Sequence, residues 1–221
     1  MFSSLREDID RVLVSDPAAV NRLHVFLFWP GLHAIWAYRL AHRFWRRGWR
    51  FMAHIIAYVS RTVTGVEIHP GAEIGPRFFI DHGMGVVIGE TAVIGADVTI
   101  YHGVTLGGVR SHKGKRHPTV EDDVVIGAGA KVLGAICIGT GSRIGANAVV
   151  VKDVEQERVV VGIPGRAIVR SDPNHPHPDL RHDDLPDVVE NHLRNIRLRL
   201  AQLEKAAQID PSLVPEPDYY L

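Results

Sequence analysis

Residues 119–150 read TVEDDVVIGAGAKVLGAICIGTGSRIGANAVV and decide the fold. An aliphatic residue stands at every sixth position of this stretch, and a glycine often follows it. The same spacing occurs upstream, with a slip of two residues near Val86 and a longer slip between Leu106 and Val120. The aliphatic positions are Ile68, Ile74, Ile80, Val86, Ile88, Ile94, Ile100, Leu106, Val120, Ile126, Val132, Ile138, Ile144 and Val150. Neither a helical period of about 3.6 nor a strand period of about 2 produces this pattern.

A unit of six residues fits one flat side of a triangular coil, so that three units make one turn of about 18 residues. The aliphatic side chain of each side points inward, and small residues at the corners let the backbone turn sharply. The repeat therefore predicts a hexapeptide parallel β-helix over residues 65–169, and it disfavours an ordinary β-sandwich.

The register of the repeat predicts which residues share a corner. If the gap between Leu106 and Val120 replaces no whole side, one side carries Ile80, Ile100, Ile126 and Ile144. The corner two residues later then carries His82, His102, Ala128 and Ala146. Neighbouring coils lie about 4.8 Å apart, so His102 is expected one coil from His82. This corner presents a reactive spot beside a groove that suits an extended ligand, and His102 either contacts the ligand or fills the corner.

Residues 107–118 read GGVRSHKGKRHP and do not fit the repeat, which predicts a loop over residues 109–117. The loop is basic in a protein whose net charge is zero. It is either a solvated loop or an arm that binds a carboxylate or phosphate.

The residues before the repeat, 1–64, are predicted to form a helical domain. Apolar residues recur at helical spacing from Leu5, and the run ends at Ser15-Asp16-Pro17. Two further helices are expected around residues 32–40 and 51–59, the last closed by Gly65. The tryptophans of this segment indicate a packing or oligomer surface.

Residues 170–221 are predicted to contain a linker, an amphipathic helix and a tail. The stretch 171–186 is rich in Pro, His and Asp and predicts an irregular linker. From Asp187 to Ala207 the apolar residues are spaced by four and three, which predicts a short helix that docks on the protein or self-associates as a trimeric bundle. The last residues, 215–221, are expected to be disordered.

The composition excludes several classes of protein. The chain has 221 residues with 25 basic and 25 acidic side chains, which argues against a nucleic-acid binder that depends on bulk positive charge. One cysteine forms no internal disulfide. We find no signal peptide and no long uncharged apolar run, so a cytoplasmic protein without a membrane span is expected.

Three blocks of sequence carry a family resemblance. Residues 81–91 (DHGMGVVIGET), 103–108 (GVTLGG) and 115–118 (KRHP) resemble the bacterial serine O-acetyltransferases of cysteine biosynthesis, in a short form with a reduced helical domain. The similarity extends in order over about residues 5–170. It implies a left-handed parallel β-helix of hexapeptide repeats, with an N-terminal α-helical domain and a C-terminal helix and tail.

The resemblance implies transfer of acetyl from acetyl-CoA to the hydroxyl of L-serine, which gives O-acetylserine and CoA. His82 matches the general base of the family, and a histidine near its ordinary pKa of about 6.5 suits that task. Glu67 matches the carboxylate that orients this base, where the family usually has aspartate. His117 matches a second histidine of the active site.

The same resemblance assigns the binding residues. Asp16 and Asp81 match acidic groups that hold the amino acid, and Arg116 matches the ligand of its carboxylate, for which a planar guanidinium is suited. Gly108 belongs to both the substrate site and the CoA channel. The CoA channel is matched by Gly108, Ala128, Arg143 and Ala146.

Partners also follow from the resemblance. The substrates are L-serine and acetyl-CoA, and L-cysteine is expected as a feedback inhibitor. A homotrimer with active sites between neighbouring subunits is implied, with a hexamer as the alternative. Family members often insert a C-terminal isoleucine into O-acetylserine sulfhydrylase, whereas this chain ends in Leu221.

Three alternatives to this function stay open. An acetyltransferase of the same fold acts on another hydroxyl acceptor, such as a sugar or an antibiotic. A zinc hydratase needs three histidines, which His82, His112 and His117 superficially supply, although no metal is expected. A non-catalytic scaffold is opposed by the polar residues at one corner. An acyl-cysteine mechanism is disfavoured because Cys137 is far from His82 in the repeat.

Overall fold

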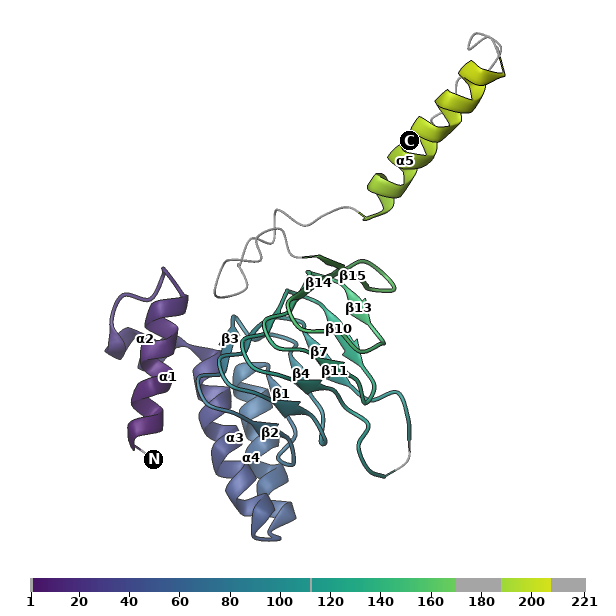
Figure 1. The fold of residues 1–221 in the computed structure, drawn as a ribbon. Coiled ribbons are helices and arrows are strands. Elements are labelled where there is room, and N and C mark those ends of the chain that lie inside the picture. Colours follow the sequence, from purple (N-terminus) through teal and green to yellow (C-terminus); the bar gives the residue numbers. More distant parts are fainter. Residues whose placement is uncertain (1, 112, 170–187, 208–221) are drawn as a thin grey trace. The chain divides into compact units, whose positions relative to one another are not determined.

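The computed structural model describes residues 2–111, 113–169 and 188–207. The chain forms two units, with the described residues up to 169 in the first and helix α5 (Val188–Ala206) in the second. The first unit combines helices with a coil of short strands (Figure 1).

The strands of the coil stack into three sheets, one for each side of a triangular solenoid (Figure 1). Side A contains β1 (Glu67–Ile68), β4 (Val87–Ile88), β7 (Thr105–Gly107), β10 (Lys131–Leu133) and β13 (Val149–Val150). Side B contains β2 (Glu73–Ile74), β5 (Val93–Ile94), β8 (Thr119–Val120) and β11 (Cys137–Ile138). Side C contains β3 (Phe79–Asp81), β6 (Thr99–Tyr101), β9 (Val125–Ile126), β12 (Arg143–Ile144), β14 (Arg158–Val161) and β15 (Arg166–Val169). All described pairs are parallel except β14 with β15, so the predicted parallel β-helix is confirmed.

The register along side C agrees with the prediction from the six-residue period. Ile80 pairs with Ile100, Ile100 with Ile126, and Ile126 with Ile144. The long insertion replaces no side, because Val120 pairs directly with Ile94. The two-residue slip lies in the turn between sides C and A.

The repeated aliphatic side chains fill the interior of the coil. They are at most 5% exposed, apart from Ile74, which packs at the edge of the core. Each buried aliphatic side chain contributes on the order of 1.5–3 kcal/mol of hydrophobic stabilisation. The small residues at the corners allow the strands to follow one another after sharp turns.

Four helices precede the coil: α1 (Phe2–Ser15), α2 (Arg22–Phe28), α3 (Pro30–Arg46) and α4 (Arg50–Thr64). Three were predicted, and α2 is an addition, capped by Asn21, whose side chain accepts a hydrogen bond from the backbone N–H of His24. Gly65 ends α4 in the left-handed region at φ 72°, as predicted from the sequence.

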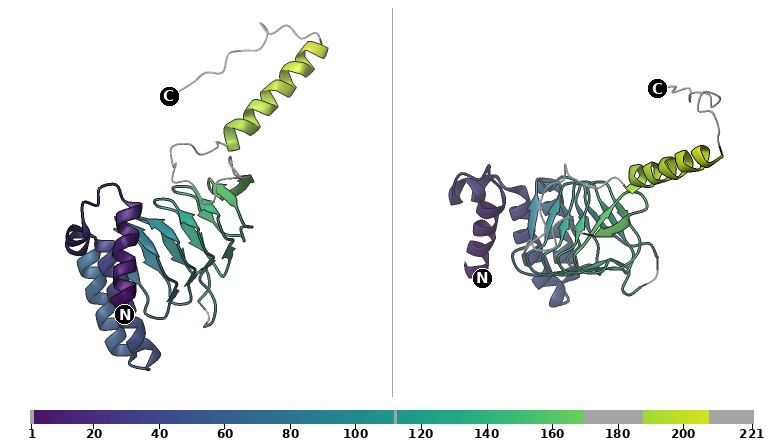
Figure 2. Two further views of the ribbon diagram at one scale, coloured as in Figure 1. Left: turned by 60° about the vertical axis from the view of Figure 1, so that its left-hand side comes forward. Right: turned by 45° about the horizontal axis from the view of Figure 1, so that its top comes forward.

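Helix α3 packs against the coil backbone to backbone. A Cβ atom on Gly31 would lie 2.3 Å from the carbonyl oxygen of Ile80, so only glycine permits this approach. Helix α1 is tied to α3 by the buried Asp8, which accepts hydrogen bonds from Trp36 and Arg39. These contacts place the end of α1 beside side C, and the coil continues from there away from the helices (Figure 2).

The second unit contains the amphipathic helix predicted near the C-terminus. Its apolar residues are exposed, namely Leu193, Ile196, Leu200 and Leu203. The predicted linker 171–186 and tail 215–221 lie outside the described residues. Among the helices that the structure describes, none is long and apolar enough to cross a membrane.

Candidate active site

His82 and His102 lie together at the corner between sides C and A, as the register predicts. They follow strands β3 and β6, and their ring centroids are 6.0 Å apart with the rings nearly perpendicular. His82 has a φ of 58°, a backbone conformation that non-glycine residues adopt rarely and often at functional sites. Its side chain is 76% exposed, so the imidazole is accessible to a ligand.

Asp81 is the carboxylate beside His82. Its Oδ2 lies 3.9 Å from the Nε2 atom of His82, and its side chain is only 19% exposed. Burial raises the pKa of Asp81, His82 opposes this effect, and the charge of Asp16 raises the pKa further. The corner therefore contains a carboxylate whose ionised form is disfavoured unless a cation approaches.

Asp16 comes to this corner from the turn after α1. Its side chain accepts a hydrogen bond of 2.8 Å from the backbone N–H of Ala18, which fixes the carboxylate in the turn. Asp16 and Asp81 thus come from segments 65 residues apart in sequence and interact electrostatically. Two neighbouring carboxylates favour a positively charged group between them.

Tyr101, which was not predicted as a site residue, belongs to the same corner. The pKa of Tyr101 is raised by burial and by the charge of Asp81, while Arg143 lowers it. Arg143 is buried on β12, two coils further along side C. The register offered a signal for Tyr101, because it pairs with Asp81 on adjacent strands.

The remaining residues predicted for the CoA channel continue along this corner. Ala128 and Ala146 stand two residues after the isoleucines of β9 and β12, as His82 and His102 stand two residues after those of β3 and β6. The backbone N–H of Gly129 donates to the carbonyl of His102, and that of Asn147 donates to the carbonyl of Ala128, each at 2.8 Å. The corner is therefore a continuous stack of two histidines followed by two alanines.

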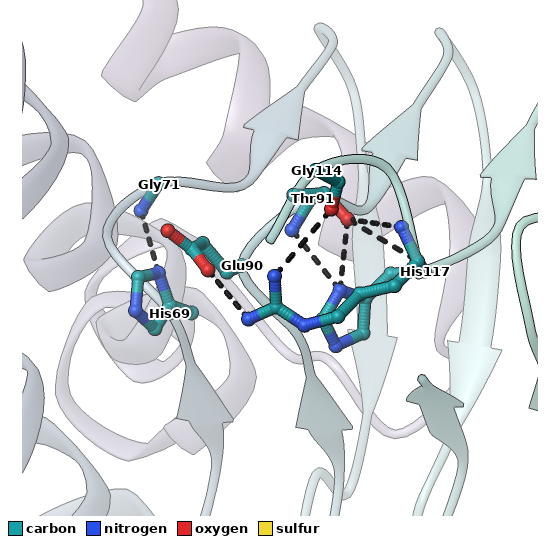
Figure 3. A network of polar contacts seen from close by, with 7 residues as sticks. His69, Gly71, Glu90, Thr91, Gly114 and His117 are labelled. Carbon is teal, nitrogen blue, oxygen red and sulfur yellow. Dashed lines mark hydrogen bonds and ion pairs between the residues drawn. The ribbon is translucent and has the colours of Figure 1, made fainter. Parts of the chain in front are cut away.

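Arg116 and His117 lie elsewhere, at the corner between sides A and B. The insertion between β7 and β8 folds back onto the residues after β4, where Arg116 donates a hydrogen bond of 2.5 Å to the carboxylate of Glu90 (Figure 3). This bond lowers the pKa of Glu90. Arg116 also donates to the carbonyl of Gly114 at 3.4 Å.

His117 is held by Thr91 beneath the loop. Its side chain is packed against the coil, and its Nδ1 atom lies 3.2 Å from the Thr91 backbone nitrogen and 2.9 Å from the Thr91 hydroxyl (Figure 3). Burial and the charge of Arg116 lower the pKa of His117, and Glu90 opposes them. A Cβ atom on Gly108 would lie 3.3 Å from the Nε2 atom of His117, so this predicted substrate and CoA residue is adjacent to the ring.

Glu90 and Thr91 belong to the block DHGMGVVIGET, and the sequence predicted no role for either. Glu90 stands two residues after Ile88, the same offset that places His82 two residues after Ile80. The six-residue period therefore predicts that Glu90, like His82, lies at a corner of the coil. The period does not predict which corner the inserted loop contacts.

Glu67 is not joined to His82 in this structure. Its carboxylate forms an ion pair with Arg61 at 3.0 Å, and the side chain is 45% exposed. Among the contacts of the described residues, none links Glu67 to either histidine at the corner of sides C and A.

Within one chain, the two groups of predicted residues lie at opposite ends of side A. From His102 at one corner to Gly108 at the other, the chain crosses side A through β7. Among the contacts of the described residues, none joins His82 to Arg116 or His117, which instead contact Glu90 and Thr91.

Neither metal chemistry nor cysteine chemistry gains support from the described residues. Within residues 2–111, 113–169 and 188–207, no three His, Cys, Asp or Glu side chains are grouped so as to hold a metal ion. His112, part of the zinc alternative, lies outside these residues. Cys137 donates a hydrogen bond of 3.6 Å to Glu121 on side B, and burial raises the pKa of its thiol, which disfavours the thiolate.

Comparisons with known proteins agree with this architecture. A family model for the bacterial transferase hexapeptide, with six repeats, matches residues 117–152. The serine acetyltransferase of Bacillus pumilus is 54% identical over 203 residues, which make up 92% of this chain and 93% of that protein.

Solved structures show the same fold at high similarity. The serine acetyltransferase of Neisseria gonorrhoeae in complex with serine has a TM-score of 0.73 and 40% identity, with coverage of 76% of this chain and 69% of that one. A serine acetyltransferase in complex with cysteine has a TM-score of 0.74 and 40% identity, with coverage of 75% and 69%. The chain therefore belongs to the serine acetyltransferase family.

Proposed function

We propose that this protein transfers the acetyl group of acetyl-CoA to the hydroxyl of L-serine, releasing O-acetylserine and CoA, as the first step of cysteine biosynthesis. The observation that carries the proposal is the corner where Asp16, Asp81 and an exposed His82 meet on a chain that is 54% identical to a serine acetyltransferase. An alcohol needs a base at neutral pH, and an amino acid needs a counter-charge for its ammonium group.

His82 is the proposed general base. Its imidazole takes the proton of the serine hydroxyl as the oxygen attacks the thioester carbonyl, and it returns a proton to the CoA sulfur when the C–S bond breaks. The exposed ring, beside a mostly buried carboxylate, suits both transfers. Glu67 is proposed to orient His82, which requires its exposed side chain to rotate away from Arg61.

The proposed serine site uses opposite charges at the two ends of the amino acid. The ammonium group lies between Asp16 and Asp81, where it relieves the repulsion that raises the pKa of Asp81. The carboxylate is bound by the guanidinium of Arg116, and His117 lies next to it. This arrangement favours serine over a sugar or another hydroxyl acceptor that lacks both charges.

The two groups of residues meet in the proposed assembly only if neighbouring chains contribute them. Arg116 and His117 of one chain face His82, Asp81 and Asp16 of the next, in a homotrimer packed through the flat sides of the solenoid. The separation of the groups within one chain supports this arrangement, and a hexamer of two trimers is the alternative.

Acetyl-CoA is the proposed co-substrate, bound along the corner of sides C and A that carries Ala128, Arg143 and Ala146, with Gly108 supplied from the corner of sides A and B of a neighbouring chain. Small residues at this corner leave room for an extended ligand, and Arg143 supplies a positive charge for a molecule that carries phosphates.

We also propose that L-cysteine occupies the serine site as a feedback inhibitor, because a solved relative is a complex with cysteine. Binding of O-acetylserine sulfhydrylase through the tail stays a prediction, as does a cytoplasmic location.

Mass spectrometry of the products tests the choice of acceptor. Incubation with acetyl-CoA and an equimolar mixture of L-serine, a hexose and an aminoglycoside is expected to yield O-acetylserine as the acetylated product. Acetylation of the sugar or the antibiotic in preference to serine would establish the alternative acetyltransferase. Zinc found by metal analysis of the purified protein, together with no acetylation of any acceptor, would favour the zinc hydratase.

A further inference from the structure

Thr91 makes five polar contacts with the inserted loop, one of which is the hydrogen bond of 2.8 Å that its backbone carbonyl accepts from Lys115 Nζ. Its hydroxyl oxygen lies 3.0 Å from the backbone nitrogen of Arg116, 3.1 Å from that of His117 and 2.9 Å from the Nδ1 atom of His117. Its own backbone nitrogen lies 3.2 Å from the same Nδ1 atom (Figure 3). One side chain thus contacts both of the residues that the family resemblance selects in the loop.

The donors and acceptors in these contacts determine the tautomer of His117. A backbone N–H only donates, so the N–H of Thr91 requires a lone pair on Nδ1. The Thr91 hydroxyl accepts from the two loop N–H groups, which leaves its own hydrogen to be donated to Nδ1. The single ring proton of a neutral His117 therefore resides on Nε2.

The charges around the ring favour the neutral form. Arg116 and Lys115 approach from the loop, while Glu90 and His69 face the ring from the coil. Burial and the two loop cations lower the pKa of His117, and Glu90 alone raises it. The surroundings of His117 thus favour the uncharged imidazole.

Packing directs the Nε2 edge of the ring toward the coil glycines. A Cβ atom on Gly89 would lie 2.0 Å from Nε2, so glycine is required there for the ring to occupy its place. Nε2 is also adjacent to Gly108, which belongs to the proposed serine and CoA sites. The N–H of Nε2 is consequently the polar group that His117 offers to a substrate.

We propose that Thr91 is a positioning residue that fixes His117 as the Nε2–H tautomer, so that His117 donates a hydrogen bond to a substrate oxygen and takes no proton in the reaction. This inference rests on the proposed function, and it assigns the two histidines different tasks. His82 moves the proton, whereas His117 supplies a fixed dipole at neutral charge.

Nuclear magnetic resonance of the free protein tests the tautomer directly. Long-range correlation of ring carbon protons with ¹⁵N-labelled histidine nitrogens distinguishes a protonated from an unprotonated Nδ1, and the His117→Gln variant identifies the signals of His117. At pH 7 we expect the Nε2–H tautomer. A spectrum with the proton on Nδ1, or with both nitrogens protonated, would overturn the inference.

Kinetics of two Thr91 variants test the role in the reaction. Thr91→Val removes the hydroxyl at nearly constant volume and is expected to lower kcat/KM roughly tenfold, the effect of losing about one well-placed hydrogen bond. Thr91→Ser keeps the hydroxyl and is expected to stay within about twofold of the wild type by the same reasoning. A Thr91→Val enzyme with wild-type constants contradicts the inference, and if this variant does not fold, the tautomer measurement decides.

Two His117 variants separate a donor from a base. Glutamine places an amide N–H near the position of Nε2, whereas asparagine is too short to reach it, and neither side chain accepts a proton at neutral pH. We expect His117→Gln to retain more activity than His117→Asn. Equal and complete loss of activity in both variants would indicate that His117 acts as a base.

Failure of the wild-type protein to acetylate serine would refute the proposed function instead. The tautomer measurement does not depend on that activity.

Discussion

At the scale of single residues, the corner of sides C and A concentrates negative charge that the fold itself does not neutralise. Asp81 is mostly buried, and both burial and Asp16 raise its pKa above the ordinary value of 3.8. The ionised carboxylate therefore reduces the free energy of unfolding. That cost appears as the pH rises through the interval between 3.8 and the raised value, and it is absent below the interval.

Replacing Asp81 with asparagine removes this cost. Because an amide oxygen still accepts the backbone hydrogen bond, we predict a higher melting temperature than the wild type at pH 7 and a difference that shrinks on acidification below the ordinary value of Asp81. The same variant loses a ligand of the serine ammonium, so its KM for serine is expected to rise by about tenfold or more. Calorimetry across pH and steady-state kinetics check both effects, and a lower melting temperature at pH 7 would contradict the assignment.

At the scale of elements, the close contact between α3 and β3 positions Asp81 and His82. Alanine at position 31 stabilises an ordinary exposed helix, but here its Cβ atom would meet the carbonyl of Ile80 at 2.3 Å. We predict that Gly31→Ala lowers the free energy of unfolding by about 1–3 kcal/mol and also reduces activity, since the neighbouring corner is displaced. Chemical denaturation measures the first effect, and a stabilised variant would show that the contact is not tight.

Helix α5 presents its apolar residues to solvent, as a helix does when a partner is missing. The exposed Leu193, Ile196, Leu200 and Leu203 follow the heptad-like spacing of a self-associating helix. We predict that deletion of residues 187–221 lowers the oligomeric mass, or weakens association on dilution, in light-scattering measurements. A truncated protein with the same mass at every concentration would oppose a trimeric helical bundle.

The elements differ in how far the sequence predicts them. The six-residue period placed Ile80, Ile100, Ile126 and Ile144 in register, because every coil repeats the same local geometry. The short helix α2 and the antiparallel strand β15 were missed. Helix α2 has only seven residues, too few to show a clear period, and β15 leaves the repeat to pair with β14.

The sequence predicts the positions of the site residues that belong to the repeat, but not the contacts of those in the inserted loop. His82 and His102 share a corner because strand register determines their positions. The contacts of Arg116 with Glu90 and of His117 with Thr91 depend on where a non-repeating loop folds back, which no local pattern encodes. The link between Glu67 and His82 came from the resemblance alone and stays a prediction, since Glu67 pairs with Arg61 here.

At the scale of the whole molecule, the separation of the two residue groups predicts complementation between inactive variants. His82→Ala and Arg116→Ala should each lose most of their activity alone. Mixed oligomers obtained by coexpression contain some sites with His82 from one chain and Arg116 from the other, both intact. We expect activity to reappear in the mixed sample and to be absent when separately purified variants are combined without subunit exchange. No recovery in verified mixed oligomers would mean that one chain forms the whole site.

The central claim is that His82 transfers a proton from serine during acetylation, and thiol release from acetyl-CoA tests it most directly. The wild-type protein is expected to release CoA rapidly with L-serine and little without an acceptor. His82→Ala, verified as folded by circular dichroism, is expected to lose a factor of roughly 10²–10⁴ in rate, the usual contribution of a general base. Thiol release that does not depend on serine, or that persists at the wild-type rate in His82→Ala, would contradict the account.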